Sequence, residues 1–165
     1  MLININEIDL IVFDFDGVLT NNYVYVDQVG NEIVRCSRAD GLAFDVLRKL
    51  EKEILILSSE KNVVVFKRAK KLQLNVIHGV ENKLNSLKKY IEKNEISMHR
   101  VMYIGNDIND FSCMQLCGVS GSPYDAHPSI LAISDFTLSK KGGDGVVRDL
   151  VENIFKINPL DILFK

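Results

Sequence analysis

Residues 8–20 have the sequence IDLIVFDFDGVLT, and this stretch decides how the chain folds. Residues 8–13 are mostly aliphatic or β-branched and stop at a loop that contains Gly17, which predicts a buried strand. Asp14 and Asp16 follow at its carboxyl end, where open α/β sheets bind their ligands. Two carboxylates this close repel each other, so the pair needs a cation or a shared proton. An Asp-rich turn that only closes a strand is the alternative.

Strand-like and helical runs alternate along the rest of the chain, which predicts a parallel sheet joined by crossover helices. Further strands are expected at residues 54–57, 75–77 and 101–104, near 119 and at 136–138, and helices at 39–52, 63–72, 83–93, 107–117 and 144–155. The expected fold class is α/β: a Rossmann-like doubly wound parallel sheet in one domain that spans residues 1–165.

A β-hairpin is expected between the first strand and the first helix. Residues 23–26 and 32–36 are rich in β-branched and aromatic side chains and flank a turn that contains Gly30. The first of these runs places Tyr23 and Tyr25 on one face and Val24 and Val26 on the other. We expect one face to pack on its own domain and the second to form an interface.

The composition argues against several classes of partner. The formal net charge is −2, so there is no electrostatic case for binding nucleic acid or an anionic membrane surface. Three cysteines do not make an even disulfide framework, and no segment resembles a signal peptide or a transmembrane helix. A cytoplasmic protein with neither nucleic acid nor a membrane as partner is the expectation.

Polar residues of particular kinds follow four of the expected elements: Asp14, Asp16 and Thr20, then Ser58, then Lys83, then Asp107 and Asp110. Phosphoryl transfer requires such groups: a carboxylate nucleophile, a second carboxyl for proton transfer, donors for the phosphoryl oxygens and hard oxygen ligands for Mg²⁺. Taken alone, each has a structural interpretation, such as a helix N-cap for Ser58 or a surface position for Lys83.

The order DxDGxxT, Ser58, Lys83 and GNDxxD resembles the four motifs of the haloacid dehalogenase superfamily of phosphohydrolases, across the whole chain. The resemblance implies that Asp14 is the nucleophile, which forms an aspartyl-phosphate, and that Asp16 is the general acid and base. It also implies that Ser58 and Lys83 bind the phosphoryl oxygens.

The same resemblance implies a Mg²⁺ ion held by Asp14, by Asp16 through its backbone carbonyl and by Asp107, with Asp110 orienting Lys83 or a metal-bound water. Many members have Gly-Asp-Asp where this chain has Gly105-Asn106-Asp107, so the last ligand aligns with either position. We expect Asp107, because an amide is the weaker ligand for a hard cation.

The spacing leaves no room for a cap domain between Thr20 and Ser58 or between Ser58 and Lys83. Together with the hairpin, this resembles the capless sugar-acid phosphatases that act on octulosonate 8-phosphate or nonulosonate 9-phosphate, whose hairpins assemble a tetramer. A homotetramer and a sugar phosphate substrate are therefore expected. Residues 142–148 resemble the C-terminal Gly-rich segment and Arg of those enzymes, with a flexible turn before a helix as the alternative.

Substrate choice depends on fewer residues. The octulosonate enzymes typically have Thr-Gly-Arg where this chain has Ser58-Ser59-Glu60, and Glu60 with Lys61 resembles the nonulosonate branch instead. Lys71 lies about three helical turns beyond Glu60, so both are expected on one helix face, either as substrate ligands or as a solvated surface. The residues assigned to substrate binding are Thr20, Glu60, Lys71 and Arg148.

The nonulosonate (acylneuraminate) 9-phosphate is the favoured substrate. The alternatives are a 3-deoxy-D-manno-octulosonate 8-phosphate phosphatase, a receiver-like signalling domain, and a non-catalytic assembly domain like those attached to sialic acid-activating cytidylyltransferases.

Overall fold

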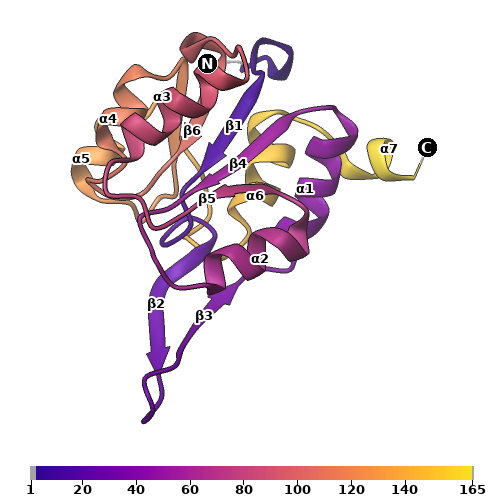
Figure 1. Ribbon diagram of the computed structural model, residues 1–165. Helices are drawn as coiled ribbons and strands as arrows, with labels where there is room; N and C mark the ends of the chain where they lie inside the picture. The colour runs from indigo at the N-terminus through magenta and orange to yellow at the C-terminus, as the bar shows by residue number, and fades with distance from the viewer. Residues whose placement is uncertain (1–2, 165) are drawn as a thin grey trace.

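A six-stranded parallel sheet forms the centre of the protein, in a computed structural model that describes residues 3–164 (Figure 1). The strand order is β5-β4-β1-β6-β7-β8, and every neighbouring pair is parallel. The strands are β1 (Leu10–Phe13), β4 (Glu53–Leu57), β5 (Asn75–Ile77), β6 (Val101–Ile104), β7 (Val119–Ser122) and β8 (Phe136–Thr137). The order reverses beside β1, so the carboxyl end of β1 lies where such sheets bind ligands. The predicted fold class is confirmed.

Helices cover both faces of this sheet (Figure 1). One face carries α1 (Ala39–Lys49), α2 (Val64–Leu72), α6 (Val146–Asp149) and the π-helical segment η3 (Leu150–Ile154); the other carries α3 (Lys83–Lys93), α4 (Phe111–Leu116) and α5 (Pro128–Leu131). Because side chains alternate along a strand, Ile11 and Phe13 enter the first core while Leu10 and Val12 enter the second. All four residues of β1 are buried, as the apolar run predicts.

Three short helical segments lie outside the predicted elements or at their margins. They are η1 (Ile5–Glu7), η2 (Met98–Arg100) and α7 (Pro159–Leu163). The last lies beside α1, where Lys49 Nζ donates to the carbonyls of Ile162 at 3.2 Å and Leu163 at 3.1 Å. No helix among residues 3–164 is long and apolar enough to cross a membrane.

The hairpin consists of β2 (Thr20–Val26) and β3 (Glu32–Cys36), which pair antiparallel as a separate two-stranded sheet. It leaves the carboxyl end of β1 and projects away from the domain (Figure 1). Tyr23, Tyr25, Val24 and Val26 are between 52% and 72% exposed, so both faces of this part of β2 are free in the single chain, whereas Val34 and Cys36 of β3 are partly buried against the first core. The prediction that one of the two faces of β2 packs on its own domain is therefore wrong for these four residues, because this part of the hairpin extends past the helices that would cover it (Figure 1).

The Gly-rich segment after β8 packs tightly on the loop that follows β1. A Cβ atom at Gly142 would lie 2.2 Å from the carbonyl oxygen of Gly17 and 2.8 Å from that of Thr20. The N–H of Gly143 donates to the carbonyl of Val18 at 3.0 Å. These glycines therefore serve close packing of two backbones, which a merely flexible turn would not require.

We expect Gly142→Ala to lower the free energy of unfolding by about 1–3 kcal/mol, because its methyl group would displace the loop that carries Asp16. Gly41→Ala is the matched control, since its nearest neighbour is the Leu72 side chain at 3.7 Å and it lies inside α1. That change should be neutral or stabilising by about 0.5–1 kcal/mol. Urea denaturation measures both, and equal effects would contradict the steric argument.

Candidate active site

A buried ion cluster lies at the carboxyl edge of the sheet. Lys83 Nζ lies 2.7 Å from Asp14 Oδ1 and 2.7 Å from Asp110 Oδ1. Asp14 follows β1, Lys83 begins α3 and Asp110 precedes α4, so three elements distant in sequence meet here. All three side chains are almost completely inaccessible to solvent, and such burial is tolerated because the charges are paired.

Asp110 also fixes the loop after β6. Its carboxylate accepts hydrogen bonds from the Tyr103 hydroxyl at 2.8 Å and from the N–H groups of Asn106 at 3.0 Å and Asp107 at 3.3 Å. Residues 107–110 therefore form a turn, and α4 begins at Phe111 instead of the predicted residue 107. Asp110 holds both Lys83 and the 105–107 backbone in place.

Asp16 is held by Thr20. The Thr20 hydroxyl donates to Asp16 Oδ1 at 3.2 Å and accepts from the N–H groups of Gly17 and Asn22, both at 3.2 Å. Thr20 is completely buried, so its hydroxyl serves these internal contacts. Burial raises the pKa of Asp16, and the Thr20 hydrogen bond opposes that rise. A raised pKa favours a carboxyl that can donate a proton.

Burial and the neighbouring charges together shift the pKa values of Asp14 and Lys83 in the ion cluster. Burial raises the pKa of Asp14 to about 8, and repulsion from Asp110 adds to it, while Lys83 acts to lower it. Burial would lower the pKa of Lys83, but the nearby carboxylates of Asp14 and Asp110 outweigh it and raise that pKa. Lys83 is therefore held as a cation between the two carboxyl groups.

An open hollow of about 260 Å³ lies above this cluster, and we call it the catalytic hollow. It is lined by Asp14, Asp16, Asn22, Ser58, Ser59, Glu60, Asn106, Asp107 and Asn109. Ser58 Oγ accepts the N–H of Glu60 at 3.1 Å, and Glu60 Oε1 accepts the N–H of Asn62 at 2.6 Å. Glu60 thus lies at the mouth of the hollow with one carboxylate oxygen engaged by its own loop.

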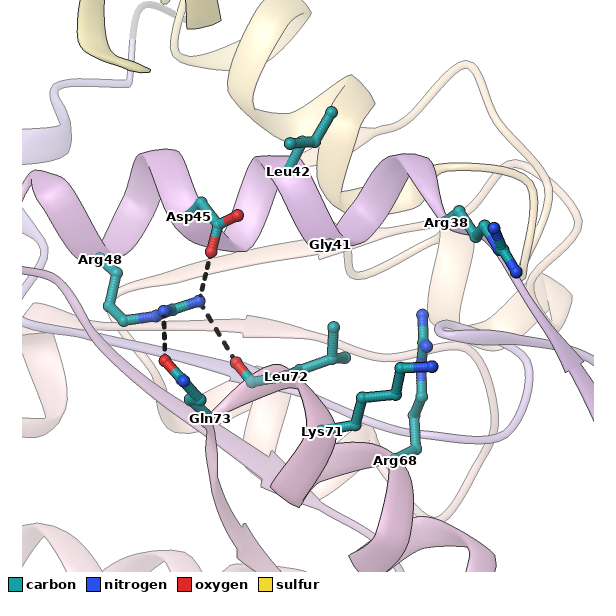
Figure 2. A pocket seen from close by; sticks show the side chains of 9 residues that line it. All are labelled: Arg38, Gly41, Leu42, Asp45, Arg48, Arg68, Lys71, Leu72 and Gln73. Atoms are coloured by element: carbon teal, nitrogen blue, oxygen red, sulfur yellow. Dashed lines mark hydrogen bonds and ion pairs between the residues drawn. The ribbon is translucent and has the colours of Figure 1, made fainter. Parts of the chain in front are cut away.

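Lys71 lies elsewhere. It lines a separate hollow of about 490 Å³ between α1 and α2, together with Arg38, Arg48 and Arg68 (Figure 2). Figure 2 shows Lys71 and Arg68 rising from α2 toward α1, with Arg48 bonded to Asp45 at 2.6 Å. The expectation that Glu60 and Lys71 share a helix face is wrong, because α2 begins at Val64 and Glu60 belongs to the preceding loop.

Arg148 is also outside the residues that line the catalytic hollow. Its guanidinium pairs with Glu152 at 3.0 Å and donates to the carbonyl of Ala39 at 3.4 Å. The backbone N–H of Arg148 donates to Asp40 Oδ1 at 3.2 Å. Within this chain it therefore ties α6 to the start of α1.

Asn106, not Asp107, faces Asp14 and Asp16. One end of the buried Asn106 amide lies 3.2 Å from Asp14 Oδ2 and 2.8 Å from the carbonyl oxygen of Asp16. Asp107 is exposed at the rim, and its Oδ1 accepts the N–H of Ile108 at 2.7 Å. With its nitrogen turned inward, Asn106 donates to both oxygens; with its oxygen turned inward, three oxygens converge on one point.

Those three oxygens suit a small hard cation. Neighbouring ligands of an octahedral Mg²⁺ with bonds of 2.0–2.1 Å lie ~3 Å apart. The Asn106 amide lies at similar distances, 3.2 Å and 2.8 Å, from Asp14 Oδ2 and the Asp16 carbonyl oxygen. Among residues 3–164 no group of three or more His, Cys, Asp or Glu side chains could hold a metal ion. The candidate centre instead combines one carboxylate, one backbone carbonyl and one amide.

Sequence reasoning missed Tyr103 and Asn22. Tyr103 carries the only hydroxyl in the otherwise apolar run of β6, a signal that could have pointed to a buried acceptor nearby. Asn22, at the start of the hairpin, lines the catalytic hollow, and no motif indicates it.

The chain matches the family model of haloacid dehalogenase-like hydrolases over residues 44–150. The 3-deoxy-D-manno-octulosonate 8-phosphate phosphatase of Salmonella typhi is 30% identical over 149 residues, which are 88% of this chain and 78% of that protein. A HAD family hydrolase from Streptomyces avermitilis superposes with a TM-score of 0.90 at 39% identity, over 92% of this chain and 87% of that one.

A third similar protein was solved with ligands. It is the 3-deoxy-D-manno-octulosonate 8-phosphate phosphatase from Moraxella catarrhalis, in complex with a magnesium ion, a phosphate ion and a KDO molecule. It superposes with a TM-score of 0.89 at 29% identity, over 95% of this chain and 91% of that one. The class of this protein is therefore a hydrolase. More particularly, the chain belongs to the haloacid dehalogenase-like hydrolase family, as the order of its motifs predicts.

We expect Lys83→Met to lower the free energy of unfolding by about 3–5 kcal/mol, because it leaves two carboxyl groups buried without their cation. Lys89→Met is the matched control: Lys89 is an exposed position of the same helix, where the change should stay within about 0.5 kcal/mol. Chemical denaturation followed by circular dichroism compares the two. Similar stability of both variants would mean that the ion cluster does not stabilise the fold.

Proposed function

We propose that this protein is a Mg²⁺-dependent phosphatase that hydrolyses the phosphate ester of a 2-keto-3-deoxy sugar acid. The observation that carries the proposal is the joint placement of Asp14, Lys83 and Asn106 at one edge of the sheet. A carboxylate, a buried cation and an inward-facing amide at one point are the groups that a phosphoryl group and its metal require.

In the proposed mechanism an oxygen of Asp14 attacks the phosphorus, and the bond from phosphorus to the sugar oxygen breaks. Asp16 gives its proton to the departing alkoxide; the raised pKa of Asp16 supports this role. Asp16 then takes a proton from a water molecule, whose oxygen attacks the aspartyl-phosphate. Phosphate leaves and the Asp14 carboxylate is restored.

Ser58 and Lys83 hold the phosphoryl oxygens in this proposal. Ser58 lines the catalytic hollow; Lys83 is not among its lining residues but contacts Asp14, which is. Asp110 and Thr20 contact no substrate; they position Lys83 and Asp16. A network fixed before substrate arrives need not reorganise during the reaction.

We propose Asp14 Oδ2, the Asp16 carbonyl and the Asn106 amide oxygen as the Mg²⁺ ligands, in place of the expected Asp107. The separations of 3.2 Å and 2.8 Å support Asn106, and the exposed rim position of Asp107 argues against its carboxylate. When bound, the cation would neutralise negative charge on Asp14 and on the phosphoryl group.

The sugar-acid class is supported by the names of the similar phosphatases and by the KDO molecule in the Moraxella catarrhalis structure. Within that class we propose a nine-carbon nonulosonate 9-phosphate as the preferred substrate. Glu60 supports it, because its second carboxylate oxygen is free at the mouth to accept a hydrogen bond from a hydroxyl or an amide. The octulosonate 8-phosphate is the second candidate, favoured by the names of the relatives.

Phosphate release from a panel of sugar phosphates tests the activity. Asp14→Asn should abolish turnover, Asp16→Asn should slow it by ~10²–10⁴-fold, and a chelator should remove activity that added Mg²⁺ restores. Asn106→Ala should raise the Mg²⁺ concentration needed for half-maximal rate by roughly 10–100-fold, with Asp107→Ala as the matched control at the adjacent position.

Three outcomes would contradict parts of the proposal. Turnover by Asp14→Asn near the wild-type rate rules out the covalent mechanism. A larger Mg²⁺ effect from Asp107→Ala than from Asn106→Ala restores the first ligand assignment. A wild-type preference for the eight-carbon over the nine-carbon ester rejects the nonulosonate assignment and leaves the octulosonate one. No metal-dependent hydrolysis at all favours the non-catalytic assembly domain.

We also propose that the protein works as a homotetramer in the cytoplasm, joined through its hairpins. The exposed apolar residues of β2 on both faces support the assembly, and the three unpaired cysteines suit a reducing compartment. A hairpin that leaves the edge of one site can reach the open mouth of another.

Val26→Glu, which puts a charge on this exposed apolar strand, should dissociate the assembly and raise KM. Lys89→Glu is a control at an exposed position of α3, which packs on the opposite face of the sheet from the core that β3 contacts, and should leave the mass in solution unchanged. Light scattering combined with steady-state kinetics checks both variants. A wild-type protein that is monomeric and fully active refutes the assembly.

A further inference from the structure

A second hollow, which we call the side hollow, adjoins the catalytic hollow. Its volume is about 360 Å³, and Asn22 and Asn106 line both spaces. The side hollow is completed by Gly17, Asn21 and Tyr23 on one side and by Asp125 and Lys141 on the other. The two spaces are therefore neighbours that meet at Asn22 and Asn106.

The charges in these two spaces are unevenly distributed. Asp14, Asp16, Glu60, Asp107 and Asp125 supply carboxyl groups, whereas Lys141 is the one cation among the described residues that line them. Lys83 lies beneath the catalytic hollow and is already paired with Asp14 and Asp110. Among the described lining residues, Lys141 is therefore the side chain that attracts an anionic group of the substrate other than the phosphoryl group.

Lys141 is available for such a contact. Its side chain is exposed and forms no ion pair with any residue in the range 3–164; Nζ lies 5.7 Å from the centre of the Tyr124 ring. A cation over an aromatic face gains ~0.5–1 kcal/mol at exposed sites, which orients the side chain without neutralising its charge.

The backbone beside Lys141 is fixed relative to the catalytic loop. The backbone N–H of Gly142 donates to Asp125 Oδ1 at 3.0 Å, and that of Gly143 donates to the Val18 carbonyl at 3.0 Å. The backbone N–H of Asp144 donates to the Lys141 carbonyl at 3.1 Å. Because Gly142 leaves no room for a Cβ atom against Gly17, this segment cannot shift away from Asp16 without breaking contacts. The cation therefore has a defined place at the rim of the side hollow.

We propose that Lys141 binds the carboxylate of the substrate and so selects sugar-acid phosphates over neutral sugar phosphates. This inference depends on the proposed phosphatase function. In a sugar acid with its ester at the far end of the carbon chain, the carboxylate and the phosphoryl group lie at opposite ends. With the phosphoryl group at Asp14, the carboxylate must lie outside the catalytic hollow, and Lys141 is the cation that meets it.

The test compares Lys141→Gln with Lys140→Gln. Lys140 is the exposed neighbour that lines neither hollow, so it is the matched control for loss of one positive charge. Each variant is assayed in the full-length protein with Mg²⁺, on a 2-keto-3-deoxy sugar-acid phosphate and on a neutral hexose phosphate. Unfolding curves of both variants check that the fold is intact.

Lys141→Gln should raise KM for the sugar-acid phosphate by roughly 10–100-fold, the range expected when a hydrogen bond to a charged group is lost, and change kcat little. The loss on the hexose phosphate should be at least about tenfold smaller, and Lys141→Arg should recover most of the affinity because it keeps the charge. Lys140→Gln should resemble the wild type on both substrates.

Equal losses on both substrates, or no loss on either, would overturn the role of Lys141 while leaving the phosphatase proposal intact. A wild-type enzyme that hydrolyses the hexose phosphate at least as well as the sugar-acid phosphate overturns the sugar-acid class, and the inference with it. Absence of any phosphatase activity removes both at once. The substrate panel therefore separates the failure of the inference from the failure of the function.

Discussion

The buried contact of Lys83 with Asp14 and Asp110 is the constraint on which the rest of the site depends. Three charges withdrawn from water are tolerable only when their geometry is good and the remaining lone pairs are satisfied. The Tyr103 hydroxyl and the backbone N–H groups after β6 donate hydrogen bonds to the remaining lone pairs of the Asp110 carboxylate. The ends of β1 and β6 must therefore lie side by side with the start of α3 behind them, and the strand order provides this.

The site is correspondingly divided into a rigid part and an open part. The groups assigned to chemistry come from strand ends and a helix start, where packing limits movement. The catalytic hollow, at about 260 Å³, is smaller than the roughly 300–1,000 Å³ in which proteins bind drug-sized ligands. In the proposed function, the remainder of a sugar-acid phosphate would extend toward the side hollow and the hairpin. Specificity in this proposal therefore depends on loops, and chemistry depends on the sheet.

The sequence predicted the sheet, the hairpin and the order of the motifs, because each has a strong local pattern or a characteristic spacing. It did not predict which of Asn106 and Asp107 faces inward. That choice depends on Asp110, whose carboxylate draws in both N–H groups and turns the 105–107 backbone. It misplaced Glu60 and Lys71 on one helix because the start of α2 was expected one residue early and Glu60 was treated as part of the helix. Local patterns cannot report contacts between residues far apart in the chain.

In the proposed tetramer, the base of the hairpin would couple assembly to substrate recognition. The loop that carries Asp14 and Asp16 continues directly into β2, and Asn21, Asn22 and Tyr23 at the base of the hairpin line the side hollow. On the opposite side, Arg35 of β3 pairs with Asp144 at 2.8 Å, next to the segment that fixes Lys141. In the proposed assembly, a partner on the exposed hairpin residues would contact the same hairpin whose base lines the side hollow. Gly142 and Gly143 pack directly on the backbone of residues 17–21, so the segment that carries Lys141 and the base of the hairpin are held against each other without intervening side chains.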